Sequence, residues 1–182
     1  MRNLIVSICL IALLSALTMC AGTAPENRIY NEGRALHSDG MRKLGKGKDA
    51  RKEGRLWDAI QAFREAEKLF LSAGSKLFKS IEVHRERIDA PHGDPYESWE
   101  PSTRVAMNTA YNDHSRAKIL RLQTEAQLHQ KEGNKDALLK SLKELRTTIA
   151  GLSSFDVLEG DRDKILMKID RAISTLESAP KP

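Results

Sequence analysis

The sequence predicts an all-α protein built from antiparallel helical hairpins, with five to six helices that form either a repeat-like stack or an elongated helix bundle. Three observations support this class. Ala, Leu, Lys, Glu and Arg dominate the chain, and these residues favour helices. Apolar residues recur at spacings of three and four, which is the period of a helix face. Val is rare and long β-branched runs are absent, which argues against a sheet.

The first twenty residues have the order of a secretory signal peptide: a positive start at Arg2, an apolar run over residues 4–17, then small and polar residues. The run is shorter than the roughly 20 residues that a spanning helix needs, so an uncleaved membrane anchor is the second choice. We therefore expect a signal peptide over residues 1–20, a tether over 21–28, a helical domain over 29–178 and a tail over 179–182.

Leu17-Thr18-Met19-Cys20 resembles the lipobox of bacterial lipoproteins. The resemblance implies that Cys20 is lipidated and becomes the first mature residue. The exported protein would then be anchored to a membrane on its periplasmic or outer face. Met19 departs from the pattern, in which a small residue precedes the cysteine. The alternative is an ordinary signal peptide cut near Gly22, which would leave a periplasmic or secreted protein.

The helical domain is expected to begin near Ile29. A second helix begins near Leu56, where an apolar stripe recurs at helical spacing. The members of that stripe are Leu56, Ile60, Phe63, Phe70, Leu77, Ile81 and Ile88. Gly74 costs the helix about 1 kcal/mol relative to Ala, so the helix is expected to bend or break there, or to run straight through. Pro91 and Pro95 end it, because proline cannot continue a helix.

The C-terminal half is expected to contain three further helices. Ser102 would cap a long helix over residues 103–131, whose apolar seam is rich in small alanines. Gly133 and Asn134 separate it from a helix that carries a clean apolar stripe, formed by Leu138, Leu142, Leu145 and Ile149. A turn over residues 151–154 then leads to the last helix, over 161–176.

Residues 40–71 resemble one tetratricopeptide repeat, a family that packs pairs of antiparallel helices. Gly47 and Ala50 match the first helix, and Gly54 matches the turn. The second helix matches at Leu56, Ala59, Phe63 and Ala66. Residues 118–150 resemble a second unit more loosely. Leu71 stands where the family has a helix-ending proline, so we expect the second helix to overrun the repeat. The resemblance implies a surface that binds other proteins.

A dense run of basic residues is the strongest candidate for a binding surface. Its members are Arg42, Lys43, Lys46, Lys48, Arg51, Lys52 and Arg55, opposed only by Asp49 and Glu53. The repeat-like arrangement implies that three of them share a face with polar residues of the later hairpin. The implied partner-binding residues are Lys48, Arg51, Lys52, Gln123, Gln127, Gln130 and Lys131. Such side chains donate hydrogen bonds and suit a carboxylate-bearing segment. The alternatives are a solvated basic face and attraction to anionic lipid heads.

The loop between the second and third predicted helices is a second candidate interface. It contains Tyr96 and Trp99, and both residue types are favoured as interface anchors. The alternative is that Trp99 folds back and covers the helix ends.

Several motifs that could carry chemistry are incomplete. Gly40–Gly47 is close to a phosphate-binding loop, but Gly47 stands where Ser or Thr must follow Lys46. No apolar strand precedes this segment either, so a Lys-rich helix is expected there and no nucleotide. The sequence contains no Gly-x-Ser-x-Gly elbow and no His-Glu-x-x-His helix, and it has no cysteine nucleophile after residue 20. We therefore expect no enzyme.

Metal binding is the other chemistry to consider. The loop also carries His92, Asp94, Glu97 and Glu100. Oxygen and imidazole ligands of this kind suit zinc or calcium, yet their spacing matches no known site. We expect no metal and no cofactor. His84 falls on the apolar stripe of its helix, where a buried, hydrogen-bonded histidine is expected.

The sequence therefore favours a non-catalytic adaptor or scaffold of the cell envelope, which binds another envelope protein through a basic helical face. A nucleic-acid partner is not expected. Two alternatives stay open: a structural surface lipoprotein without a peptide groove, and a helical bundle that binds a metal or ligand through the loop of His92. The net charge of +5 weakly favours an anionic partner in each case.

Overall fold

The computed structural model describes residues 24–88, 99–152 and 161–178. In these ranges it contains five α-helices and no strand, which confirms the predicted all-α class and the helix count. The helices are α2 (Pro25–Lys52), α3 (Leu56–Ile88), α4 (Trp99–Lys131), α5 (Lys135–Ala150) and α6 (Arg162–Ser178). The predictions for the signal peptide, Cys20, Tyr96 and the tail over 179–182 lie outside the described residues.

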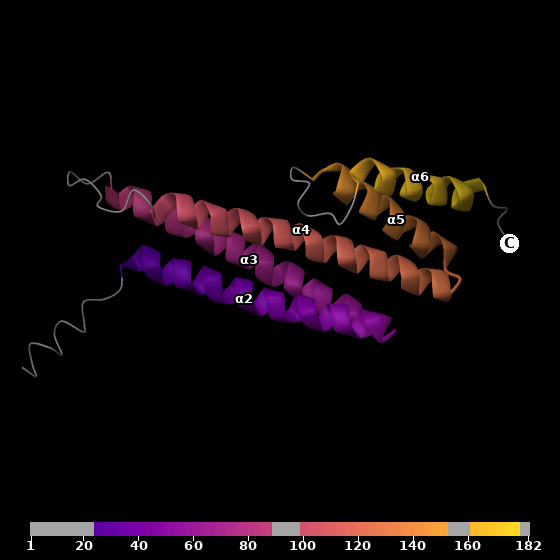
Figure 1. Cartoon of the computed structure of the whole chain (residues 1–182), viewed down its shortest axis with the longest axis horizontal. Coiled ribbons are helices and arrows are strands. Elements are labelled where there is room, and N and C mark those ends of the chain that lie inside the picture. Colours follow the sequence, from indigo (N-terminus) through magenta and orange to yellow (C-terminus); the bar gives the residue numbers. More distant parts are fainter. Residues whose placement is uncertain (1–23, 89–98, 153–160, 179–182) are drawn as a thin grey trace, which may run out of the picture.

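The helices alternate in direction and form an elongated bundle (Figure 1). The long helices α2, α3 and α4 lie side by side, the shorter α5 packs along the C-terminal half of α4, and α6 packs mainly on α5. Each helix packs mainly against its neighbour in sequence, while α2 and α4 meet at few positions. As a result, α2, α4 and α6 run in one direction and end at the same end of the molecule.

Helix α2 begins at Pro25, so the tether predicted over 21–28 is too long by its last four residues. Proline is tolerated in a first helical turn because its missing N–H would have no partner there. The helix also runs without interruption through residues 40–47. This segment is therefore helical, as expected from the incomplete phosphate-binding motif.

A ladder of buried glycines joins α2 to α3. Gly33, Gly40 and Gly47 recur every seventh residue and face large side chains of α3. A Cβ atom at Gly47 would lie 2.5 Å from Cε1 of Phe63, and one at Gly40 would lie 2.6 Å from Cε1 of Phe70. Without Cβ atoms, the two helices approach closely enough to bury both rings completely.

Helix α3 is continuous from Leu56 to Ile88, so Gly74 neither breaks nor ends it. Gly74 is buried, and a Cβ atom there would lie 2.7 Å from Cε1 of Tyr111 on α4. Its lack of a side chain thus admits the tyrosine ring between the helices, which compensates for its low helix propensity.

Helix α4 begins at Trp99, earlier than the predicted start at residue 103. Ser102 therefore lies inside the first turn and is not the N-cap. Pro101 is accommodated in that turn for the same reason as Pro25. The predicted alanine-rich seam is buried, and Ala110 and Ala117 are fully buried against the neighbouring helices.

The turns on either side of the central helices use glycine in the left-handed conformation. Gly54 has φ +77° and Gly133 has φ +67°, values that glycine adopts readily. After the second turn, the side chain of Asn134 caps α5 by accepting a hydrogen bond of 3.1 Å from the N–H of Ala137. Together α4, α5 and α6 enclose a second apolar core that includes Leu122, Ile149 and Ile169.

None of the helices in the described ranges is long and apolar enough to cross a membrane.

Candidate functional site

The basic residues near the end of α2 lie beside the glutamines of α4. Lys48, Arg51 and Lys52 follow at spacings of three and four, so they share one face of α2. The guanidinium group of Arg51 donates hydrogen bonds of 3.1 Å to Gln127 and 3.3 Å to Gln123. The two groups of residues that the sequence placed on one surface are therefore neighbours in space.

These residues surround an open hollow of about 550 Å³ between α2 and α4. Lys48, Arg51, Lys52 and Gln127 line it, and Leu120 contributes the apolar part. We call this hollow the basic hollow. It contains hydrogen-bond donors and a small apolar patch, and none of its described lining residues carries a carboxylate. Such a site can accept an anionic group and adjacent aliphatic carbon atoms.

The positive charge in the basic hollow is weakly compensated. Arg51 is half-buried, and burial lowers the pKa of its guanidinium group. Its hydrogen bonds to the two glutamines supply no negative charge. The Nζ atom of Lys52 lies 4.0 Å from Asp49, and both side chains are mostly exposed, so this ion pair contributes little. An incoming carboxylate would therefore find cations that no carboxylate among the described residues holds closely.

Three predicted residues do not line the basic hollow: Gln123, which accepts a hydrogen bond from Arg51, and also Gln130 and Lys131. Gln130 lines a neighbouring hollow between α4, α5 and α6. Lys131 is the exposed last residue of α4 and lines neither hollow in the described part of the chain.

The neighbouring hollow has a volume of about 490 Å³ and was not expected from the sequence. Its lining includes Lys168, Arg171 and Thr175 of α6, together with Gln127 of α4. The spacing of the three α6 residues places them on one face of the helix, and this could have been seen in the sequence. Their position beside α4 depends on how α6 packs, and spacing alone does not give that.

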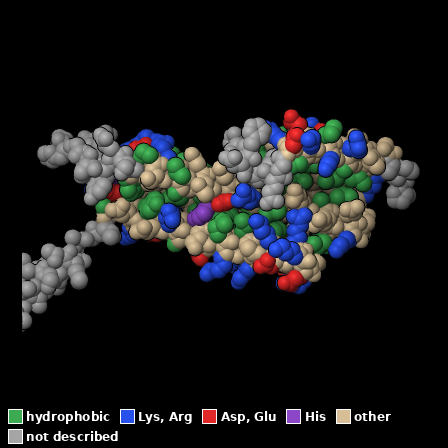
Figure 2. All heavy atoms as spheres, viewed as in Figure 1, with side chains coloured by type: hydrophobic (Ala, Val, Ile, Leu, Met, Phe, Trp, Pro, Cys, Tyr) green, Lys and Arg blue, Asp and Glu red, His purple; other side chains and the backbone are tan. Residues whose placement is uncertain are grey.

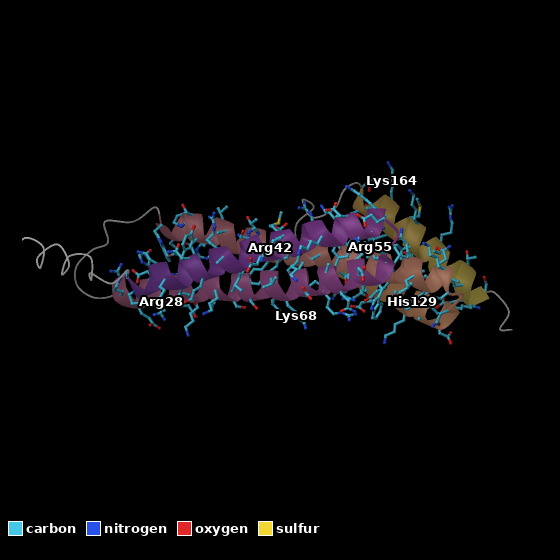
Figure 3. All side chains as sticks on the ribbon, turned by 90° about the horizontal axis from the view of Figure 1, so that it is seen from below. Arg28, Arg42, Arg55, Lys68, His129 and Lys164 are labelled. Atoms are coloured by element: carbon cyan, nitrogen blue, oxygen red, sulfur yellow. The ribbon has the colours of Figure 1, made fainter. Side chains whose placement is uncertain are left out.

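On the face shown in Figure 2, apolar side chains gather where the C-terminal helices meet, and Lys and Arg side chains lie around them. The side chains in Figure 3 mark the two ends of the bundle. Arg55, His129 and Lys164 lie toward the end where α2, α4 and α6 terminate, and Arg28 lies at the opposite end. The basic hollow, at the C-terminal end of α2, thus belongs to the same end as the packed short helices.

Trp99 packs back onto the bundle. Its ring centroid lies 4.4 Å from that of His84 on α3 and 6.0 Å from that of Tyr30 on α2. This contact is the arrangement considered as the alternative to an interface anchor. Tyr96 lies outside the described residues.

His84 is buried, as predicted, in a polar cluster at the start of α2. Its Nδ1 lies 3.7 Å from Oε1 of Glu26, which is only 2% exposed. The same carboxylate oxygen lies 2.5 Å from Nη2 of Arg87. These contacts join the first turn of α2 to the last turns of α3 and help to hold the two helix ends together.

Of the four residues considered for metal binding, the structure describes only Glu100. The carboxylate of Glu100 accepts hydrogen bonds from Arg85 of α3 and Arg104 of α4. These hydrogen bonds lower the pKa of Glu100 to about 2. Its oxygens thus link α3 to α4 by hydrogen bonds. The other three residues, His92, Asp94 and Glu97, lie outside the described residues, and the described part of the chain contains no group of three or more metal-binding side chains.

Comparison with known proteins finds no family model that matches the chain, and no curated protein or solved structure that is significantly similar to it. The resemblance to the tetratricopeptide repeat therefore stays a prediction, as does the absence of catalytic activity.

Proposed function

We propose that this protein is a non-catalytic adaptor of the cell envelope that binds an acidic segment of another envelope protein in the basic hollow. One observation carries the proposal: Arg51 is half-buried, donates only to amide oxygens among the described residues, and lies between two exposed lysines. Carboxylates form stronger, charge-assisted hydrogen bonds with guanidinium groups than amides do. A partner's Asp or Glu would therefore compensate the charge of Arg51, which no carboxylate in the described ranges contacts.

Elsewhere in the described chain, most arginines are paired with acids of the bundle. Arg121 with Glu67, Arg146 with Asp170 and Arg104 with Glu100 are examples. A basic side chain that simply stabilises the bundle would be expected to follow this pattern. The difference at Arg51 supports binding over a purely solvated face.

Charge reversal in the basic hollow tests the proposal. The double variant Lys48→Glu/Lys52→Glu leaves Arg51 and its hydrogen bonds in place. A zero-length carbodiimide crosslinker, which joins lysine amines to carboxylates, is applied to intact cells. In the native chain we expect Lys48 or Lys52 to be joined to an Asp or Glu of one envelope protein, identified by mass spectrometry. The double variant is expected to retain at least tenfold less of this protein when it is purified from the envelope without crosslinker, a measurement that does not depend on the two lysine amines that the variant removes.

The matched control is Lys68→Glu/Lys79→Glu, which changes the net charge equally on exposed positions of α3. It should capture the same protein as the native chain, and far-UV circular dichroism should show unchanged melting for both variants. Equal capture by the two double variants, or no lysine–carboxylate crosslink at the basic hollow, would contradict the adaptor function and favour a purely structural bundle.

We further propose that the adaptor is held at a membrane through a lipid on Cys20. The support is the lipobox-like sequence 17–20. The Cys20→Ala variant is expected to move from the membrane fraction to the soluble fraction of the envelope, because an acyl anchor can no longer form. Cys9→Ala is the matched control and should stay with the membrane. A Cys20→Ala protein that remains on carbonate-washed membranes would refute the lipid anchor.

A further inference from the structure

The hollow between α4, α5 and α6 has a largely apolar floor. Leu138 and Leu142 of α5 and Ala172 and Leu176 of α6 line it, and all four are partly exposed. They lie beyond the buried core of the C-terminal helices, where Leu145 and Ile173 are covered. We call this hollow the apolar hollow. Partly exposed aliphatic side chains gathered in a concave surface favour the binding of another apolar group.

The apolar hollow and the basic hollow adjoin each other. Gln127 of α4 lines both, so they share a wall. Helices α2, α4 and α6, which run in the same direction (Figure 1), supply most residues along this surface, and α5 adds Leu138 and Leu142. An occupant that enters the basic hollow can therefore continue across Gln127 into the apolar one.

The rim of the apolar hollow is also basic. Lys168 and Arg171 are exposed and form no ion pair with any residue in the described ranges. Two acids of the same helix pair with α5 instead: Asp170 pairs with Arg146 and Glu177 with Lys143. None of the described residues that line either hollow is acidic. The positive charge thus extends from α2 to α6 along one continuous surface.

We propose that the segment bound by this protein is both acidic and apolar, with an aliphatic or aromatic side chain seated in the apolar hollow and Asp or Glu residues on both sides of it. The acidic residues would contact Lys168 and Arg171 on α6 and Lys48, Arg51 and Lys52 on α2. This inference rests on the proposed function and names the chemistry of the partner. Exposed charges alone bind weakly, so the buried side chain supplies affinity and the charges supply orientation and selectivity.

The test uses a phage-displayed library of random twelve-residue peptides, panned against the full-length chain in detergent micelles. We expect the selected peptides to share one aliphatic or aromatic residue with Asp or Glu nearby. A fluorescent copy of the best peptide is then measured by anisotropy. Replacing its apolar residue with serine, or its acids with amides, is expected to weaken binding at least tenfold. These changes lie in the peptide and cannot unfold the protein.

Variants of the protein locate the site. Lys168→Glu/Arg171→Glu and Leu176→Ser should each weaken binding of the peptide about tenfold or more, while the Lys68→Glu/Lys79→Glu control should not. Acidic peptides without an apolar residue that are lost only in Lys48→Glu/Lys52→Glu would overturn this inference and leave the proposed function standing. Selected peptides with no preference for Asp or Glu would overturn both this inference and the proposed function. Dimerisation through the apolar hollow, seen by light scattering and lost in Leu176→Ser, would also overturn it.

Discussion

Replacing Phe63 with alanine is expected to lower the free energy of unfolding by about 3–5 kcal/mol, the usual range for a buried phenylalanine. Phe63 is fully buried, and its ring lies directly over Gly47 of α2. Because glycine has no side chain that could move into the space, the cavity would stay largely unfilled. Urea unfolding of the full-length chain, followed by far-UV circular dichroism and linear extrapolation, measures the change.

Phe78→Ala is the matched control, since it makes the same change on the same helix at a position that is 49% exposed. We expect the free energy of unfolding of this variant to fall by about 1 kcal/mol or less, as is usual for surface substitutions. If Phe63→Ala destabilised the protein no more than Phe78→Ala does, the close packing of α2 on α3 would be refuted.

The second large effect is expected for Arg121→Met, because Arg121 contacts acids on three helices, with Oε1 of Glu144 on α5 the most distant at 3.8 Å from Nη2. Its Nε lies 2.6 Å from Oε1 of Glu67 on α3, and its Nη1 lies 3.0 Å from Oε2 of Glu125 on α4. Burial alone would lower the pKa of Arg121, but the hydrogen bonds to Glu67 and Glu125 outweigh it and raise the pKa. The guanidinium group is thus held firmly in its charged form.

Methionine keeps much of the length of Arg121 but leaves two largely buried carboxylates without their shared cation. Breaking a buried ion pair in this way usually costs 3–5 kcal/mol, and because the site is only partly enclosed we expect about 2–4 kcal/mol in urea unfolding. Arg146→Met is the control, since Arg146 and Asp170 are both about half exposed. A similar loss in both variants would mean that Arg121 stabilises the protein no more than a surface pair does.

Much of the fold could be predicted from the sequence, because helix period and turn residues are local properties. The apolar stripe of α3 and the glycine turns at Gly54 and Gly133 all lie where the sequence placed them. The starts of α2 and α4 were placed too late. Pro25 and Pro101 both lie in a first helical turn, where proline is tolerated, and the predicted starts did not take that signal into account.

The candidate site could be predicted only in part. Helical spacing and the resemblance to a repeat placed Arg51 near Gln123 and Gln127, and the structure has them in contact. Lys168 and Arg171 were missed, because spacing shows which residues of α6 share a face but not which helix that face meets. Trp99 shows the same limit: its contacts with His84 and Tyr30 depend on the packing of three helices.

The order in which the helices pack bears on how the chain reaches this structure. Each helix lies mainly against the one before it, so most native contacts join residues that are near one another in sequence. Proteins with such low contact order lose little entropy in closing loops and fold quickly. The α2–α3 hairpin contains the glycine ladder and both buried rings. It can therefore pack before α5 and α6 do, and each later helix then adds to a surface that already exists.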